Sequence, residues 1–161
     1  MTPIDHLHPA TVHFPIALLL AASAAGLLYI FWRPRVDLRI VTWWGLIAGW
    51  LAAVVAVFSG VLAQRNLPPD APYRSVLNWH ISAGVATLIL YGAVLYLHWL
   101  YQSARARRQR EKNGRNFADI LDDPQRRSVI AVLLIAGAVC VFLSGWNGGQ
   151  LVYQWGVNVV R

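Results

Sequence analysis

Four long apolar stretches set the pattern of hydrophobic and polar positions along the chain. They cover residues 12–32, 41–63, 77–101 and 128–152, and none of them contains Asp, Glu, Lys or Arg. A helix of about 20 residues crosses the hydrocarbon core of a bilayer, and the strict alternation of apolar and polar residues that marks a barrel strand is absent. The pattern predicts an all-α protein, a single transmembrane domain over residues 1–161 built as an up-and-down four-helix bundle.

The composition supports a membrane protein and excludes several other classes. Hydrophobic residues make up 57% of the chain and charged residues 13%, compared with about 25% charged residues in soluble domains. So much apolar surface excludes a disordered chain and disfavours a soluble globular one. A single cysteine, Cys140, excludes an intramolecular disulfide and any cysteine-based metal or iron–sulfur site within one chain.

The basic residues are unevenly distributed among the loops. The net charge is +7, and eleven of the fourteen Lys and Arg residues lie in loops 33–40 and 102–127. Basic loops mark the cytoplasmic side, so we expect a multi-pass protein of a bacterial inner membrane with both termini in the periplasm, and a lipid partner rather than nucleic acid. Loop 102–127 is predicted to lie against the anionic inner leaflet, with a short helix over residues 116–122 that ends before Pro124.

Tryptophan is unusually frequent and lies near the ends of the apolar stretches. Tryptophan side chains concentrate at the two membrane–water interfaces. We therefore expect an inner belt of Trp32, Trp43, Trp44 and Trp99, and an outer belt of Trp79, Trp146 and Trp155.

The two halves of the chain resemble each other. The first stretch opens with HFPIA at His13, and the third opens with HISAG at His80. The second stretch closes with SGVLAQ from Ser59, and the fourth closes with SGWNGGQ from Ser144. This suggests a parallel repeat about an axis normal to the membrane. In an up-and-down bundle the first and third helices lie on a diagonal, so we expect the two histidines to lie there at similar depth.

Two histidines on a bundle diagonal are suited to a flat cofactor held from both faces. Neighbouring helices lie about 8–10 Å apart, which gives a diagonal of about 11–14 Å. Ionisable groups that face the interior of a membrane bundle are functional candidates. The sequence predicts one haem b with His13 and His80 as axial ligands, and His8 as an alternative to His13. The cations expected to neutralise the haem propionates are Arg65, Arg74 and Arg161.

Other roles for the histidines are open. His6, His8 and His13 form an H-x-H…H pattern that suits a Cu or Zn site, since imidazole binds both metals. Interfacial histidines also often only hydrogen-bond a neighbour. His98 lies near the inner side without another histidine there, and we expect it to extend toward the interface. The absence of acidic residues from all four stretches and of hydrolase motifs favours an electron-transfer subunit over a stand-alone catalyst.

Two segments carry a family resemblance that covers nearly the whole chain. Residues 8–18 read HPATVHFPIAL, and residues 144–157 read SGWNGGQLVYQWGV. They resemble the bacterial four-span membrane family catalogued as domain of unknown function 2231, which shares an HPxxVHFPI opening, a histidine early in the third span and an SGWxGGxLVYxxGV closing motif. The family commonly has Glu where Gln150 stands and His where Trp155 stands, so we expect no ligand at Trp155.

The resemblance implies the four-span fold and gives a hint about function. Members similar to this chain occur fused to, or beside, c-type cytochrome or Rieske domains. On this basis His8, His13 and His80 occupy the family's histidine positions.

We therefore expect a small b-type cytochrome that passes electrons between a quinol or membrane oxidoreductase and a periplasmic cytochrome or Rieske protein. The alternatives are a periplasmic-side Cu/Zn-binding membrane protein and a cofactor-free structural subunit that anchors a redox complex.

Overall fold

The computed structural model describes residues 11–65, 67–114 and 117–157. Within these ranges the chain is helical and contains no strand. The helices are α2 (His13–Phe31), α3 (Val36–Ala63), α4 (Arg74–Gln102), α5 (Ala104–Lys112) and α6 (Arg127–Tyr153). Of these, α2, α3, α4 and α6 are long and apolar enough to cross a membrane, which confirms the predicted all-α membrane bundle. Helix α3 starts five residues before the predicted apolar stretch, because the pattern marks only the part suited to lipid.

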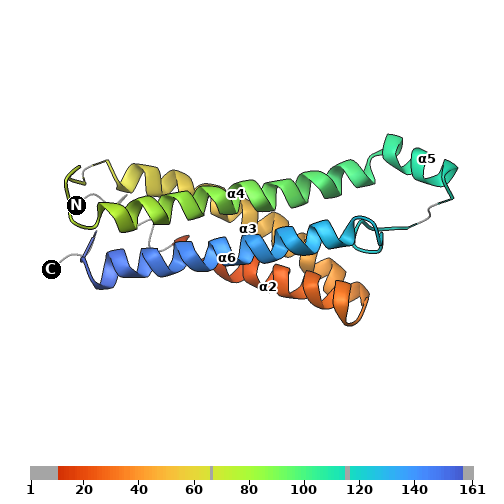
Figure 1. The fold of residues 1–161 in the computed structure, drawn as a ribbon, viewed down its shortest axis with the longest axis horizontal. Coiled ribbons are helices and arrows are strands. Elements are labelled where there is room, and N and C mark those ends of the chain that lie inside the picture. The colour runs from red at the N-terminus through yellow and green to blue at the C-terminus, as the bar shows by residue number, and fades with distance from the viewer. Residues whose placement is uncertain (1–10, 66, 115–116, 158–161) are drawn as a thin grey trace.

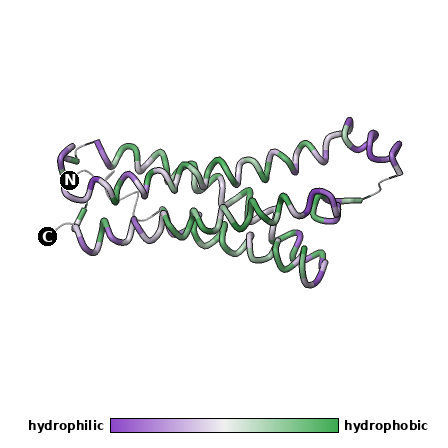
Figure 2. Tube along the Cα trace, viewed as in Figure 1, coloured by the Kyte–Doolittle hydropathy of each residue, from purple (hydrophilic) through white to green (hydrophobic). Residues whose placement is uncertain are grey.

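The four long helices run up and down alongside one another (Figure 1). Helix α2 packs along α3 and α4 packs along α6, and looser α2–α6 and α3–α4 contacts join the two pairs. Among the described residues α2 and α4 have no close backbone contact, so they lie on a diagonal as the sequence predicted. We call the end of the bundle where α4 begins the His80 end, and the opposite end the α5 end. Apolar residues occupy the middle of the bundle, and polar residues gather at its two ends and on α5 (Figure 2).

Two glycines allow α2 and α3 to pack closely. A Cβ atom added at Gly45 would lie 2.9 Å from Cβ of Ala22, and one added at Gly49 would lie 2.9 Å from Cγ of Leu19. Lipid provides no hydrophobic drive between helices, so close backbone approach through small residues supplies much of the packing energy.

A buried tyrosine joins the two diagonal helices at the centre of the bundle. Tyr91 of α4 is fully buried, and its hydroxyl lies 2.7 Å from Oγ of Ser23 in α2. The face of its ring rests on Gly137 of α6, where an added Cβ would lie 2.7 Å from Cζ. Tyr91 thus contacts two helices besides its own and fixes their relative positions.

The segment before α6 closes the α5 end of the bundle. Ile120 and Leu121 are almost fully buried there. Three aspartates of the segment each accept a hydrogen bond from an aromatic side chain of a different helix: Asp122 Oδ1 from Tyr29 of α2 (2.6 Å), Asp119 Oδ2 from Trp43 of α3 (2.9 Å) and Asp123 Oδ2 from Tyr101 of α4 (3.4 Å). We call residues 117–126 the aspartate strap, because they tie together α2, α3 and α4.

The predicted short helix over residues 116–122 is wrong for the described part of that range, where the chain forms turns from residue 118 to residue 122. The reason is local: Oδ1 of Asp119 accepts a hydrogen bond from the backbone N–H of Leu121 at 2.9 Å. An aspartate that binds the backbone two residues later favours a turn over a helix. Helix is found earlier in the predicted basic loop, as α5.

Six of the seven tryptophans assigned to the two belts are exposed. The inner set Trp32, Trp44 and Trp99 and the outer set Trp79, Trp146 and Trp155 are exposed. Trp43 departs from the pattern, because it is buried and donates its indole N–H to the strap. Its neighbour Trp44 is exposed, since adjacent residues of a helix point about 100° apart.

Candidate functional site

His80 lies in the second turn of α4 and is held against α6. Its Nδ1 is 2.8 Å from the backbone carbonyl oxygen of Ser144. A carbonyl only accepts hydrogen bonds, so the neutral ring carries its proton on Nδ1 and its lone pair on Nε2. The Ser144 hydroxyl lies 3.3 Å from Nδ1 and donates to the His80 carbonyl at 3.3 Å. Histidines that bind metals often donate one ring N–H to a backbone carbonyl in this way, which fixes the tautomer and the orientation of the ring.

Glycine makes room for the imidazole ring. A Cβ added at Gly148 of α6 would lie 3.1 Å from Cε1 and 3.2 Å from Nδ1 of His80. One helical turn earlier on α6, Ser144 lies opposite Gly84 of α4, whose added Cβ would be 3.7 Å from the serine hydroxyl. Ser144 and Gly148 of the closing motif therefore seat the His80 ring against α6.

His13 lies at the same end of the bundle but does not join His80 in the structure. It is the first residue of α2 and is exposed. Its depth follows from Ile16, whose Cδ1 would lie 3.7 Å from a Cβ added at Gly145, next to Ser144. His13 is thus about one turn, or about 4.5 Å, farther toward the His80 end than the level of the His80 contact. None of the interactions among described residues connects the two histidines.

The predicted propionate partners occupy different settings. Arg74 at the start of α4 braces the loop before it, with Nη2 2.8 Å from the carbonyl oxygen of Pro68 and Nε 3.1 Å from that of Pro69. Arg65 is exposed after the end of α3. Arg161, together with His6 and His8, lies outside the described residues.

A second polar cluster, at the α5 end, was missed by sequence reasoning. His98, expected to extend to the interface, instead stacks on Trp43 with ring centroids 3.6 Å apart. Its buried Nδ1 has no hydrogen-bond partner among the described residues. The sequence feature that could have indicated this cluster is the run DILDD, which begins at Asp119. It places three of the seven acidic residues of the chain in an otherwise basic loop. In the described ranges no group of three or more His, Cys, Asp or Glu side chains is arranged to hold a metal ion.

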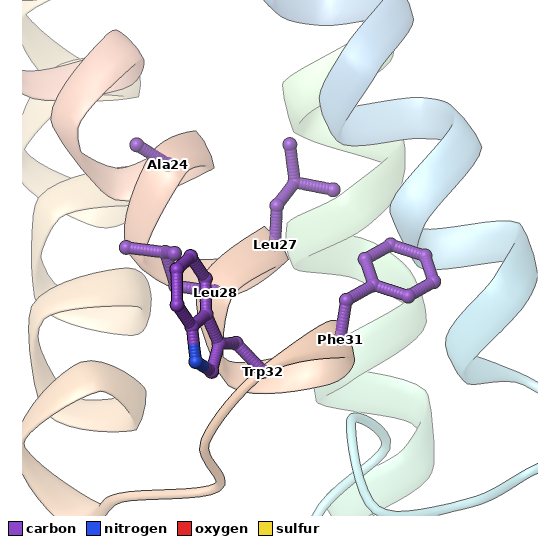
Figure 3. Close-up of a pocket in the computed structure, with 5 residues that line it drawn as sticks. All are labelled: Ala24, Leu27, Leu28, Phe31 and Trp32. Carbon is purple, nitrogen blue, oxygen red and sulfur yellow. The ribbon is translucent and has the colours of Figure 1, made fainter.

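A groove on α2 lacks the polar groups that a chemical site requires. Four side chains of that helix and the tryptophan directly after it line an open hollow of about 500 Å³ near the α5 end (Figure 3): Ala24, Leu27, Leu28, Phe31 and Trp32. A surface of this kind suits the hydrocarbon of the bilayer. The candidate site is therefore at the His80 end, where the polar and small residues of the two sequence motifs converge.

Comparison with known proteins gives one match. Searches of curated proteins and of solved structures found no match. The model of one family, described as "Predicted membrane protein (DUF2231)", matches residues 5–161. Because this match covers nearly the whole chain, including both histidine-bearing segments, the protein belongs to that family of predicted membrane proteins, as its motifs indicated.

Proposed function

We propose that the protein is a small b-type cytochrome that holds one haem b at the His80 end of the bundle. The observation that carries the proposal is the hydrogen bond between His80 Nδ1 and the Ser144 carbonyl. It sets the tautomer and orientation of a neutral imidazole, and a neutral imidazole with its lone pair on Nε2 is the donor that haem iron takes.

The second ligand is proposed to be His13, with His8 as the alternative. His13 is on α2, which lies diagonally across from α4, and His13 is about one helical turn from the level of the His80 contact. Helices on a bundle diagonal lie about 11–14 Å apart, farther than the tightly packed α2–α3 and α4–α6 pairs, and this separation suits a ring system held from both faces. Arg65, Arg74 and Arg161 are proposed as charge partners for the propionates.

The residues around His80 would set the donor strength and the orientation of its imidazole ring. The carbonyl of Ser144 makes the imidazole a stronger electron donor by accepting its Nδ1 proton in a hydrogen bond. The contact with Gly148 limits rotation of the ring. The bound haem would supply one-electron redox chemistry, and the low dielectric of the bundle would tune its potential.

The distribution of charge bears on which end of the bundle faces which side of the membrane. The loops at the α5 end carry eleven of the fourteen basic residues, which favours a cytoplasmic position for that end. The His80 end would then face the periplasm of a bacterial inner membrane. The proposed partners are a quinol or membrane oxidoreductase and a periplasmic cytochrome or Rieske protein.

The test is the absorption spectrum of detergent-purified protein from cells supplied with haem precursor, recorded oxidised and after reduction with dithionite. We expect a Soret band and sharp reduced α and β bands. His80→Ala is expected to abolish these bands, and His13→Ala to abolish or shift them. His98→Ala is the control, since it removes a histidine from the other end and leaves the bands unchanged. A well-folded wild-type protein without these bands would contradict the proposal, and metal analysis of that protein would test the Cu/Zn alternative.

Gly148→Ala is expected to disturb the site without removing a ligand. The new methyl group would lie 3.1–3.2 Å from the His80 ring, so the ring or α6 must shift by a few tenths of an ångström. We expect a loss of about 1 kcal/mol in stability from this crowding, and a shifted reduction midpoint potential when haem is bound. Gly149→Ala is the matched control, because a Cβ added at this neighbouring glycine meets no atom within 4 Å. Equal potentials for Gly148→Ala and wild type would show that the ring contact does not tune the site.

A further inference from the structure

Helix α5 is a separate basic arm at the end of α4 and not a continuation of it. The helical path breaks at Ser103, whose backbone is extended, and the Ser103 hydroxyl caps the new helix by accepting from the N–H of Ala106 at 3.4 Å. The nine residues of α5 are about 14 Å long. The helix extends beyond the rest of the bundle and is strongly hydrophilic (Figures 1 and 2).

One face of α5 carries three cations in a row. Arg105, Arg108 and Lys112 follow the spacing i, i+3, i+7, which places them in one stripe along the helix, and all three are exposed. Glu111 lies beside this face, three residues after Arg108, and pairs with Arg107 at 3.0 Å. We call Arg105, Arg108 and Lys112 the basic stripe.

The contact between Arg110 and Tyr101 fixes the direction in which the basic stripe points. Arg110 lies on the opposite side of α5 and is half-buried. Its Nη1 donates to the carbonyl oxygen of Tyr101 at 2.6 Å, and its guanidinium carbon lies 3.5 Å from the centre of the Tyr101 ring. Tyr101 is buried in the bundle, so Arg110 faces inward and the basic stripe faces away from the bundle axis.

We propose that the basic stripe binds the phosphate groups of anionic phospholipids in the bilayer that the bundle spans. The stripe starts within three residues of the end of α4, and charges interact with an anionic surface over a Debye length of about 8–10 Å. Its outward direction places the cations over the lipid headgroups that surround the protein. Each basic residue near such a surface strengthens binding about fivefold, so two of them contribute about thirtyfold.

The experiment uses full-length protein in nanodiscs of phosphatidylcholine alone or with 30% phosphatidylglycerol. A fluorescent label is attached at the exposed position Gln109 of α5, through Gln109→Cys in a Cys140→Ala background. We expect the anionic lipid to reduce quenching of the label by acrylamide at least twofold, and 0.5 M salt to reverse this effect.

The Arg105→Gln/Arg108→Gln variant is expected to lose the effect of phosphatidylglycerol on quenching. The control is Arg33→Gln/Arg35→Gln, which removes two exposed cations before α3 and is expected to keep the effect. Circular dichroism and size-exclusion chromatography confirm that each variant is folded. Quenching that is the same in both lipid mixtures, or equal loss in the two variants, would overturn the proposal. The proposal does not depend on haem binding.

Discussion

Asp119→Asn is expected to lower the free energy of unfolding by about 3 kcal/mol. Asp119 is buried, and each of its oxygens accepts a hydrogen bond, one from the indole N–H of Trp43 and one from the backbone N–H of Leu121. Asparagine has the same shape, but its NH₂ group must then face one of these two donors. The measurement is unfolding of the purified protein by SDS titration in detergent micelles, followed by circular dichroism.

Asp37→Asn is the matched control for this change. Asp37 is an exposed residue near the start of α3 that pairs with Arg35 at 2.9 Å, and exposed pairs contribute about 0–1 kcal/mol. A double-mutant cycle with Trp43→Phe isolates the indole contact. We expect Asp119→Asn to have less effect in the Trp43→Phe background, because one donor is then gone. Equal effects of Asp119→Asn and Asp37→Asn would mean that the aspartate strap does not hold the helices together.

Gly137→Ala is expected to destabilise the bundle by about 2–3 kcal/mol in the same assay. The added Cβ would lie 2.7 Å from Cζ and 2.9 Å from Cε2 of Tyr91. The ring cannot turn away easily, because it is fully buried and its hydroxyl is bound to Ser23. Helix α6 must therefore move away from α4, which loosens the contacts along that pair.

Gly149→Ala provides the control on the same helix. An added Cβ at Gly149 meets no atom within 4 Å. The helix propensity of alanine exceeds that of glycine, so this variant is expected to be as stable as wild type or slightly more stable. If Gly137→Ala behaved in the same way, close packing of Tyr91 on α6 would not contribute to stability.

The spans and the diagonal arrangement were predictable because they depend on local features. Lipid requires long, uncharged helices, and short connections such as residues 32–35 between α2 and α3 impose antiparallel neighbours. The sequence repeat also pointed to His80 and Ser144, which the structure brings together across 64 residues. The proposed pairing of His13 with His80 stays a prediction.

The aspartate strap was not predicted, for an equally physical reason. Its contacts join residues far apart in the sequence, 93 positions for Tyr29 with Asp122 and 76 for Trp43 with Asp119. Nothing near Trp43 distinguishes it from the exposed Trp44, since both fit an interfacial belt. The hydrogen bond of Trp43 depends on how the strap folds back, and helical periodicity contains no information about that step.

The unequal lengths of the helices bear on the thickness of membrane that this protein suits. Helix α2 has 19 residues and is about 28 Å long, whereas α4 has 29 residues and is about 43 Å long. A hydrocarbon core of about 30 Å is close to the length of α2, so α2 fits it best when nearly upright, while the longer helices tilt or extend into the headgroups. The shortest helix thus sets the match between protein and bilayer, and a thicker membrane would have to thin locally around α2 to accommodate the bundle.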